Sequence, residues 1–267
     1  MSKAGATRRE RGETPLTGKA AAEREARRER IVWLATGPPL LVIACVVAVL
    51  LVRNSAPEPP SPAADVAAAD RKAPPELVKA ADEVGFHPKT APGIGRVEDD
   101  PASAAPSRAN PDLLPVGARA PGFTLSTPTG ETVRLADYRG KAVLLEFFAT
   151  WCPHCAVEAP HLARLDRRLP DDRYAFLSIN ADGEDAASVF AYHRYFGLRF
   201  PALLDPSARP GSFHEPGAAG PATRRYRVLA FPTFYVVAPD GRVRWASDGE
   251  QPDALLLQEL RGAAGGR

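Results

Sequence analysis

Apolar positions between residues 113 and 267 alternate between strand-like and helix-like spacing. Residues 142–148 form a nearly continuous run of branched and aromatic side chains, which is typical of a strand buried on both faces of a parallel sheet. Further strands are predicted at 122–125, 132–135, 174–179, 200–204, 234–237 and 242–245, and helices at 135–138, 156–169, 185–196, 222–227 and 255–260. This order predicts an α/β domain at 113–267, with a central mixed sheet flanked by helices.

The chain before this domain has a different pattern. Residues 31–52 contain 22 residues without a charged side chain. At ~1.5 Å per residue they span the ~30 Å core of a bilayer, which predicts one transmembrane helix. Residues 1–30 hold nine basic and five acidic residues. Since Lys and Arg favour the inner side, we expect a single-pass cell-membrane protein whose N-terminal tail is cytoplasmic and whose remainder is extracytoplasmic. Mixed charges without aromatics in this tail argue against nucleic-acid binding.

Two processing signals are alternatives to this anchor. A cleaved signal peptide is disfavoured by the thirty-residue polar segment before the apolar run and by the length of the run. Residues 42–45 resemble a lipoprotein cleavage box, but the apolar run continues for seven residues beyond Cys45. We therefore interpret Cys45 as a small apolar residue of the membrane segment, with lipidation as the alternative.

Residues 53–112 are predicted to form an extracytoplasmic linker. They contain eleven prolines, mostly among Ala and Ser, and offer little apolar surface to offset the entropy lost on ordering. Residues 76–84 have helical spacing followed by Gly85, which suits a helix C-cap. We interpret this piece as a transient helix; packing on the domain or on a partner is the alternative.

Trp-Cys-Pro-His-Cys at 151–155 lies where the buried strand ends and a helix begins. Cys152 is expected near the positive end of the helix dipole, which favours a thiolate. Pro153 suits the first helical position, and Cys155 is three residues on, where helical side chains meet. Zinc needs about four ligands, whereas Cys45 is the only other cysteine. A structural disulfide across so short a loop would constrain little of the unfolded chain and so would add little stability. The motif therefore indicates a redox-active pair.

Several segments of the predicted domain form a further pattern. They are Ala-Pro-Gly-Phe at 120–123, residues 146–155, Glu158 with Pro160, and Phe-Pro-Thr-Phe at 231–234 before Pro-Asp-Gly at 239–241. Together and in this order they resemble the membrane-anchored TlpA/ResA-like branch of the thioredoxin superfamily. The resemblance covers about residues 113–261. It implies a thioredoxin-like fold with an N-terminal hairpin and an extra helix and strand at 184–205. It also implies that the protein exchanges disulfides with extracytoplasmic proteins and with a membrane redox donor or acceptor.

The resemblance also implies roles for individual residues. Cys152 is expected to attack a partner disulfide, and Cys155 to resolve the mixed disulfide. Pro232 matches the family's cis-proline, which brings a backbone edge beside the cysteines. Phe231 is expected to shape that contact, and Trp151 to cover the disulfide. The residues expected to bind substrate or support the cysteines are Trp151, Pro153, His154, Phe231, Pro232 and Thr233.

Two carboxylates are further candidates. Glu146 lies in the buried strand, so its pKa should be raised and it can accept the proton of Cys155; the alternative is a strand-end carboxyl in water. Glu158 lies three residues after Cys155 and is expected to act on the cysteine pair; the alternative is an i,i+4 pair with His154.

The direction of electron flow stays open. The scaffold resembles reductants, such as those of cytochrome c maturation, whereas Pro153-His154 matches the dipeptide of DsbA-like oxidants. An imidazolium near Cys152 stabilises its thiolate and makes the disulfide more oxidising.

Other functions use the same cysteines. A copper-delivery protein could bind copper through both sulfurs, although Met1 is the only methionine. A peroxidase is disfavoured because Thr150 is two rather than three residues before Cys152 and no proline precedes it in the strand. We expect no metal and no cofactor beyond the disulfide.

Overall fold

The computed structural model describes residues 62–88, 111–206, 215 and 217–265. The predicted tail (1–30), the predicted transmembrane helix (31–52) and Cys45 lie outside the described residues. Within the described ranges, no helix has the length and apolar character needed to cross a membrane.

Seven strands form one sheet in the order β2-β1-β5-β4-β3-β6-β7. The strands are β1 (Thr124–Ser126), β2 (Thr132–Arg134), β3 (Ala142–Phe148), β4 (Tyr174–Asn180), β5 (Ala202–Leu204), β6 (Thr233–Val237) and β7 (Val243–Asp248). The central strand β3 runs parallel to β4 and antiparallel to β6. The N-terminal hairpin β1–β2 is antiparallel. The mixed sheet predicted from the sequence is therefore confirmed.

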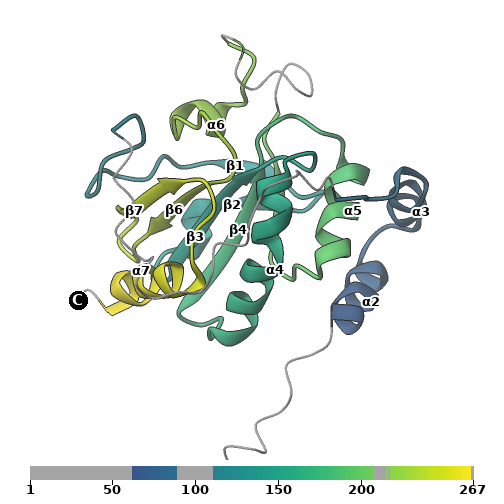
Figure 1. Cartoon of the computed structure of the whole chain (residues 1–267), viewed down its shortest axis with the longest axis horizontal. Coiled ribbons are helices and arrows are strands. Elements are labelled where there is room, and N and C mark those ends of the chain that lie inside the picture. The colour runs from purple at the N-terminus through teal and green to yellow at the C-terminus, as the bar shows by residue number, and fades with distance from the viewer. Residues whose placement is uncertain (1–61, 89–110, 207–214, 216, 266–267) are drawn as a thin grey trace, which may run out of the picture. The chain divides into compact units, whose positions relative to one another are not determined.

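Helices cover both faces of this sheet (Figure 1). They are η1 (Leu135–Tyr138), α4 (Pro153–Arg168), α5 (Ala186–Phe196), α6 (Pro221–Arg225) and α7 (Asp253–Gly265). Leu144 and Phe148 of β3 join an apolar cluster with α4, α5 and α7. Val143, Leu145 and Phe147 join a second cluster with the segment before β1 and with residues around α6. Because side chains alternate along a strand, β3 is buried from both sides. The predicted extra helix and strand are present as α5 and β5.

Two helices precede the domain, within the segment predicted as a linker. They are α2 (Pro62–Lys72) and α3 (Pro75–Val84), and we call residues 62–88 the helical arm. Ala81 of α3 clusters with Phe190 and Ala191 of α5. Phe86 makes edge-to-face contacts with three aromatic side chains of α5, namely Tyr192, Tyr195 and Phe196.

Charged contacts also hold the helical arm against the domain. Arg167 of α4 pairs with Asp65 at 3.2 Å, and Arg194 of α5 pairs with Asp70 at 3.4 Å and with Asp82. The prediction of an unstructured linker is therefore wrong for the arm, and that of a transient helix at 76–84 is wrong as well. The proline content suggested an unstructured segment. In the structure, however, Pro62 and Pro75 are the first residues of the two helices, where the missing N–H has no hydrogen bond to lose. Residues 53–61 and 89–110 of the predicted linker lie outside the described residues.

Candidate active site

Cys152 lies at the N-terminus of α4 as its N-cap residue. Its Sγ accepts a hydrogen bond from the backbone N–H of Cys155 at 3.3 Å and lies 3.7 Å from the carbonyl oxygen of Phe231. The pKa of Cys152 is lowered to about 7, mainly by the hydrogen bond from the Cys155 thiol. Burial opposes this shift, whereas backbone N–H groups and the charge of His154 add to it, His154 least of all. Cys152 is therefore the thiol of the pair that ionises near neutral pH.

Cys155 lies one turn further along α4 and is fully buried. Burial raises its pKa, and the hydrogen bond and charge of Cys152 raise it further. Tyr192 of α5 donates a hydrogen bond to the Cys155 carbonyl at 2.8 Å and so ties α4 to α5. Both cysteines are free thiols. Pro153 takes the first helical position between them, as its fixed φ predicts.

Glu146 lies on the face of β3 that α4 covers, because it is two residues from both Leu144 and Phe148, and side chains two apart on a strand share a face. Only 2% of it is exposed. Ser178 donates a hydrogen bond to its Oε2 at 2.5 Å, and its Oε1 has no hydrogen-bond partner among the described residues. Desolvation raises the pKa of Glu146 to about 8, although the Ser178 hydrogen bond lowers it. The alternative of a carboxyl in water is therefore wrong.

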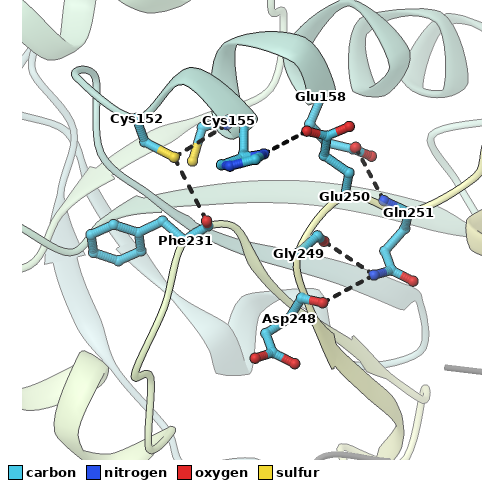
Figure 2. Close-up of polar contacts among 9 residues, drawn as sticks. Cys152, Cys155, Glu158, Phe231, Asp248, Gly249, Glu250 and Gln251 are labelled. Atoms are coloured by element: carbon cyan, nitrogen blue, oxygen red, sulfur yellow. Dashed lines mark hydrogen bonds and ion pairs between the residues drawn. The ribbon is translucent and has the colours of Figure 1, made fainter. Parts of the chain in front are cut away.

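Glu158 is the second buried carboxyl of the site. Its Oε2 accepts the backbone N–H of Gln251 at 3.3 Å, and its Oε1 is unpartnered within the described part of the chain. Burial raises its pKa, and the charges of Glu146, Asp253 and Glu250 add to the rise. His154 pairs instead with Glu250, at 2.7 Å from Nδ1 to Oε1. The alternative i,i+4 pair between His154 and Glu158 is therefore wrong. Figure 2 shows Glu158 and Glu250 next to each other beside the cysteines.

The rim of the site is apolar and partly exposed. The Phe231–Pro232 peptide bond is cis, as predicted. The ring of Phe231 packs edge-on against Trp151, with centroids 6.0 Å apart, and Trp151 is 39% exposed. Thr233 is buried, and its hydroxyl donates to the carbonyl of Ala230 at 2.7 Å, which fixes the turn before the proline. The predicted supporting residues thus surround Cys152.

Acidic side chains that the sequence argument missed hold the turn before Cys152. Glu184 accepts the backbone N–H of Thr150 at 2.7 Å and an amide hydrogen of Asn180 at 2.7 Å. Asp182 accepts the indole N–H of Trp151 at 2.7 Å. The sequence contains a pattern that could have predicted these contacts. Asn180 ends β4 and is in register with Phe148 at the end of β3, so the polar residues that follow β4 lie beside the turn that follows β3. Polar residues after adjacent parallel strands converge at one edge of a sheet.

Two further histidines, His161 and His193, are buried in the domain. His161 pairs with Asp253 at 2.6 Å and so joins α4 to α7. His193 is buried, and burial lowers its pKa to about 3. In the ranges that the structure describes, no group of three or more His, Cys, Asp or Glu side chains is placed to hold a metal ion.

Comparisons with known proteins find relatives among thiol-disulfide oxidoreductases. A family model described as the AhpC/TSA family matches residues 116–246. The thiol-disulfide oxidoreductase ResA of Geobacillus thermodenitrificans is 33% identical over 145 residues, which cover 54% of this chain and 76% of that protein. The thioredoxin-like protein YneN of Bacillus subtilis is 31% identical over 146 residues, with 54% and 78% covered. Among solved structures, a putative thiol:disulfide interchange protein DsbE from Chlorobium tepidum shares 25% identity at a TM-score of 0.49 and covers 57% of this chain and 99% of its own.

Proposed function

Because this chain belongs to the ResA-like family of thiol-disulfide oxidoreductases with a thioredoxin-like fold, we propose that it is a membrane-tethered reductant of disulfides in extracytoplasmic proteins. Segment 31–52 is the anchor, and the domain from residue 113 onward carries the redox centre. Apocytochrome c in cytochrome c maturation is the substrate class that the resemblance to TlpA/ResA-like proteins favours.

The surroundings of Cys152 support a reductant over an oxidant, because its sulfur accepts the backbone N–H of Cys155 while the His154 ring is paired with Glu250. The Cys152 pKa of about 7 is close to that of the reactive cysteine in thioredoxin, about 7, and far from the value of about 3.5 in the oxidant DsbA. A strong oxidant requires a strongly stabilised thiolate in the reduced form. This thiolate is only moderately stabilised, which supports a reducing couple.

The reaction proceeds by two thiol–disulfide exchanges. The Cys152 thiolate attacks one sulfur of a substrate disulfide, forms a mixed disulfide and releases the first substrate thiolate. Cys155 then attacks the sulfur of Cys152 and releases the second substrate thiolate. The substrate gains two electrons, and Cys152 and Cys155 become a disulfide. A dithiol donor in the membrane reduces that disulfide again.

Glu146 serves the second exchange. Cys155 is buried with a raised pKa, so its thiol needs a nearby base before it can attack. The charge of Glu146 acts on Cys155, and the pKa of about 8 leaves a fraction of the carboxyl ionised at neutral pH. In this proposal Glu146 accepts the Cys155 proton.

Substrates dock on the apolar rim. Trp151, which packs against Phe231, is 39% exposed, and Leu229, two residues before Phe231 in the chain, is 63% exposed. An extended segment with an apolar side chain next to its cysteine can cover this surface while its sulfur approaches Cys152.

Trapping tests the proposal. Reduced Cys155→Ser protein, mixed with an oxidised protein substrate, should accumulate a mixed disulfide at Cys152, whereas Cys152→Ser should accumulate none. The wild-type chain should reduce insulin disulfides with a dithiol as donor. Full insulin-reductase activity in Cys152→Ser would overturn the proposed mechanism.

A further inference from the structure

The loop between β7 and α7 is fastened to both sides of the redox centre. The N–H of Gly249 donates to the carbonyl of Pro232 at 2.8 Å, which ties the loop to the cis-proline turn. The N–H of Gln251 donates to Glu158 at 3.3 Å, which ties it to α4. The Gln251 side-chain amide closes the loop on the carbonyls of Asp248 and Gly249, at 3.2 and 3.1 Å. Figure 2 shows the contacts of Gln251 with Glu158, Asp248 and Gly249. Glu250 is thus held in place from both neighbours.

The side chain of Glu250 is directed at His154. It is 8% exposed, and its Oε1 lies 2.7 Å from Nδ1 of His154, whose side chain is 51% exposed. Among the described residues, no hydrogen bond joins the His154 ring to Cys152; the sulfur instead contacts the Cys155 N–H and the Phe231 carbonyl. The imidazole is therefore held toward a carboxylate whose loop is hydrogen-bonded to the cis-proline turn and to α4.

We propose that Glu250 is a positioning residue that holds His154 away from Cys152 and offsets its charge, and that this pairing keeps the Cys-Pro-His-Cys centre reducing. The inference rests on the proposed function as a reductant. It explains how an oxidant-type dipeptide can serve a reductive scaffold.

The charge balance supports this role. An imidazolium within a few ångströms of a thiolate stabilises it, but a carboxylate paired with Nδ1 of the ring leaves the His154–Glu250 pair with no net charge. The weak contribution of His154 to the acidity of Cys152 agrees with this arrangement. Without Glu250 the ring can turn to the thiolate with its charge unopposed. The reduced form then gains stability, and the disulfide becomes the stronger oxidant.

The test is the equilibrium of the full-length protein with reduced and oxidised glutathione, measured at pH 6 and pH 7 for the wild type, Glu250→Ala and Glu250→Gln. Glu250→Ala should shift the equilibrium about tenfold toward the dithiol, equivalent to about 30 mV for a two-electron couple. The rate of alkylation of Cys152 in Glu250→Ala should also reach half-maximum at a lower pH than in the wild type. Glu250→Gln can keep a hydrogen bond to His154 without the charge, so its shift should be smaller. Glu131→Gln, in the exposed β1–β2 turn, is the matched charge control and should shift nothing.

A double-mutant cycle separates this role from alternatives. If Glu250 acts through His154, its removal should have no effect in a His154→Gln background. A shift that survives in His154→Gln, or one that disappears in Glu158→Gln instead, would assign the effect to Glu158, whose pKa Glu250 helps to raise, and would overturn the proposal. An unchanged or more reducing Glu250→Ala couple would overturn it too. A wild-type reduction potential close to that of DsbA would refute the reductant function. The differences in potential between the variants would still test the role of Glu250.

Discussion

Carboxylates are placed differently beside the cysteines and along the helical arm. Beside the cysteines, Glu146 and Glu158 are buried, no cation of the described residues pairs with either, and their pKa values are raised. Along the arm, Asp65, Asp70 and Asp82 each face an arginine of α4 or α5. The first arrangement raises the pKa values of both carboxyls, and Glu146, with a pKa of about 8, can exchange protons near neutral pH. The second uses full charges to attach a helix pair to the domain.

The largest expected effect concerns stability at the buried site. Glu146 has a folded pKa of about 8 against an ordinary value of 4.5, so the folded state keeps a proton that the unfolded state loses. Stability should therefore fall as pH rises from about 4.5 to 8, by on the order of 5 kcal/mol at about 1.36 kcal/mol per pH unit. Glu146→Gln should lack this component.

Urea unfolding of the reduced proteins between pH 5 and pH 9 measures the difference between the two. Glu146→Gln should match the wild type at pH 5 and be more stable at pH 9. Parallel stability curves for the two proteins would show that Glu146 does not titrate as the buried site predicts.

The same substitution should slow the second exchange. A glutamine cannot accept the Cys155 proton, and general bases contribute about 10²–10⁴-fold, so release of the mixed disulfide should slow at least 100-fold. In the wild type this release should accelerate as pH rises toward 8, because the ionised carboxyl is the active form. Stopped-flow measurement of substrate thiol release checks both points. Formation of the mixed disulfide should stay within threefold of wild type and serves as the internal control.

The sequence predicted the sheet, its helices and the cysteine pair because these depend on short-range patterns. The nearly continuous apolar run at 142–148 and the helical spacing after Cys155 are local properties. The partnership of His154 with Glu250 joins residues 96 positions apart, and no local pattern encodes it. The arm was missed for a different reason. Its proline content indicated disorder. The aromatic side chains of α5 that Phe86 packs against are about 100 residues away in the chain, so no local pattern could indicate the contact.

The aromatic contact of the arm should contribute less than the buried carboxyl. Phe86 is half-buried among Tyr192, Tyr195 and Phe196. Phe86→Ala should lower the free energy of unfolding by about 2 kcal/mol, below the 3–5 kcal/mol of a fully buried phenylalanine. Denaturant unfolding measures this, with Val84→Ala, at a residue 51% exposed, as a control expected to stay within about 0.5 kcal/mol. Equal losses in both variants would mean that the aromatic contact does not hold the arm.

The ion pairs of the arm should contribute least. Arg194 pairs with Asp70 and Asp82, whose side chains are 35% and 58% exposed. Arg194→Gln should cost about 1 kcal/mol or less, and the cost should shrink in high salt. Lys79→Gln, which removes an exposed i,i+4 pair with Glu83, is the matched control with an expected cost near zero. A salt-independent loss of several kcal/mol would show that Arg194 acts by packing rather than by charge.

The reduction potential of the Cys152–Cys155 couple tests the central claim most directly. It can be measured on the full-length protein by equilibration with glutathione or dithiothreitol buffers and alkylation of the free thiols. A reductant predicts a value close to that of thioredoxin, about −270 mV. A value close to that of DsbA, about −120 mV, would contradict the account and assign the protein to the oxidants.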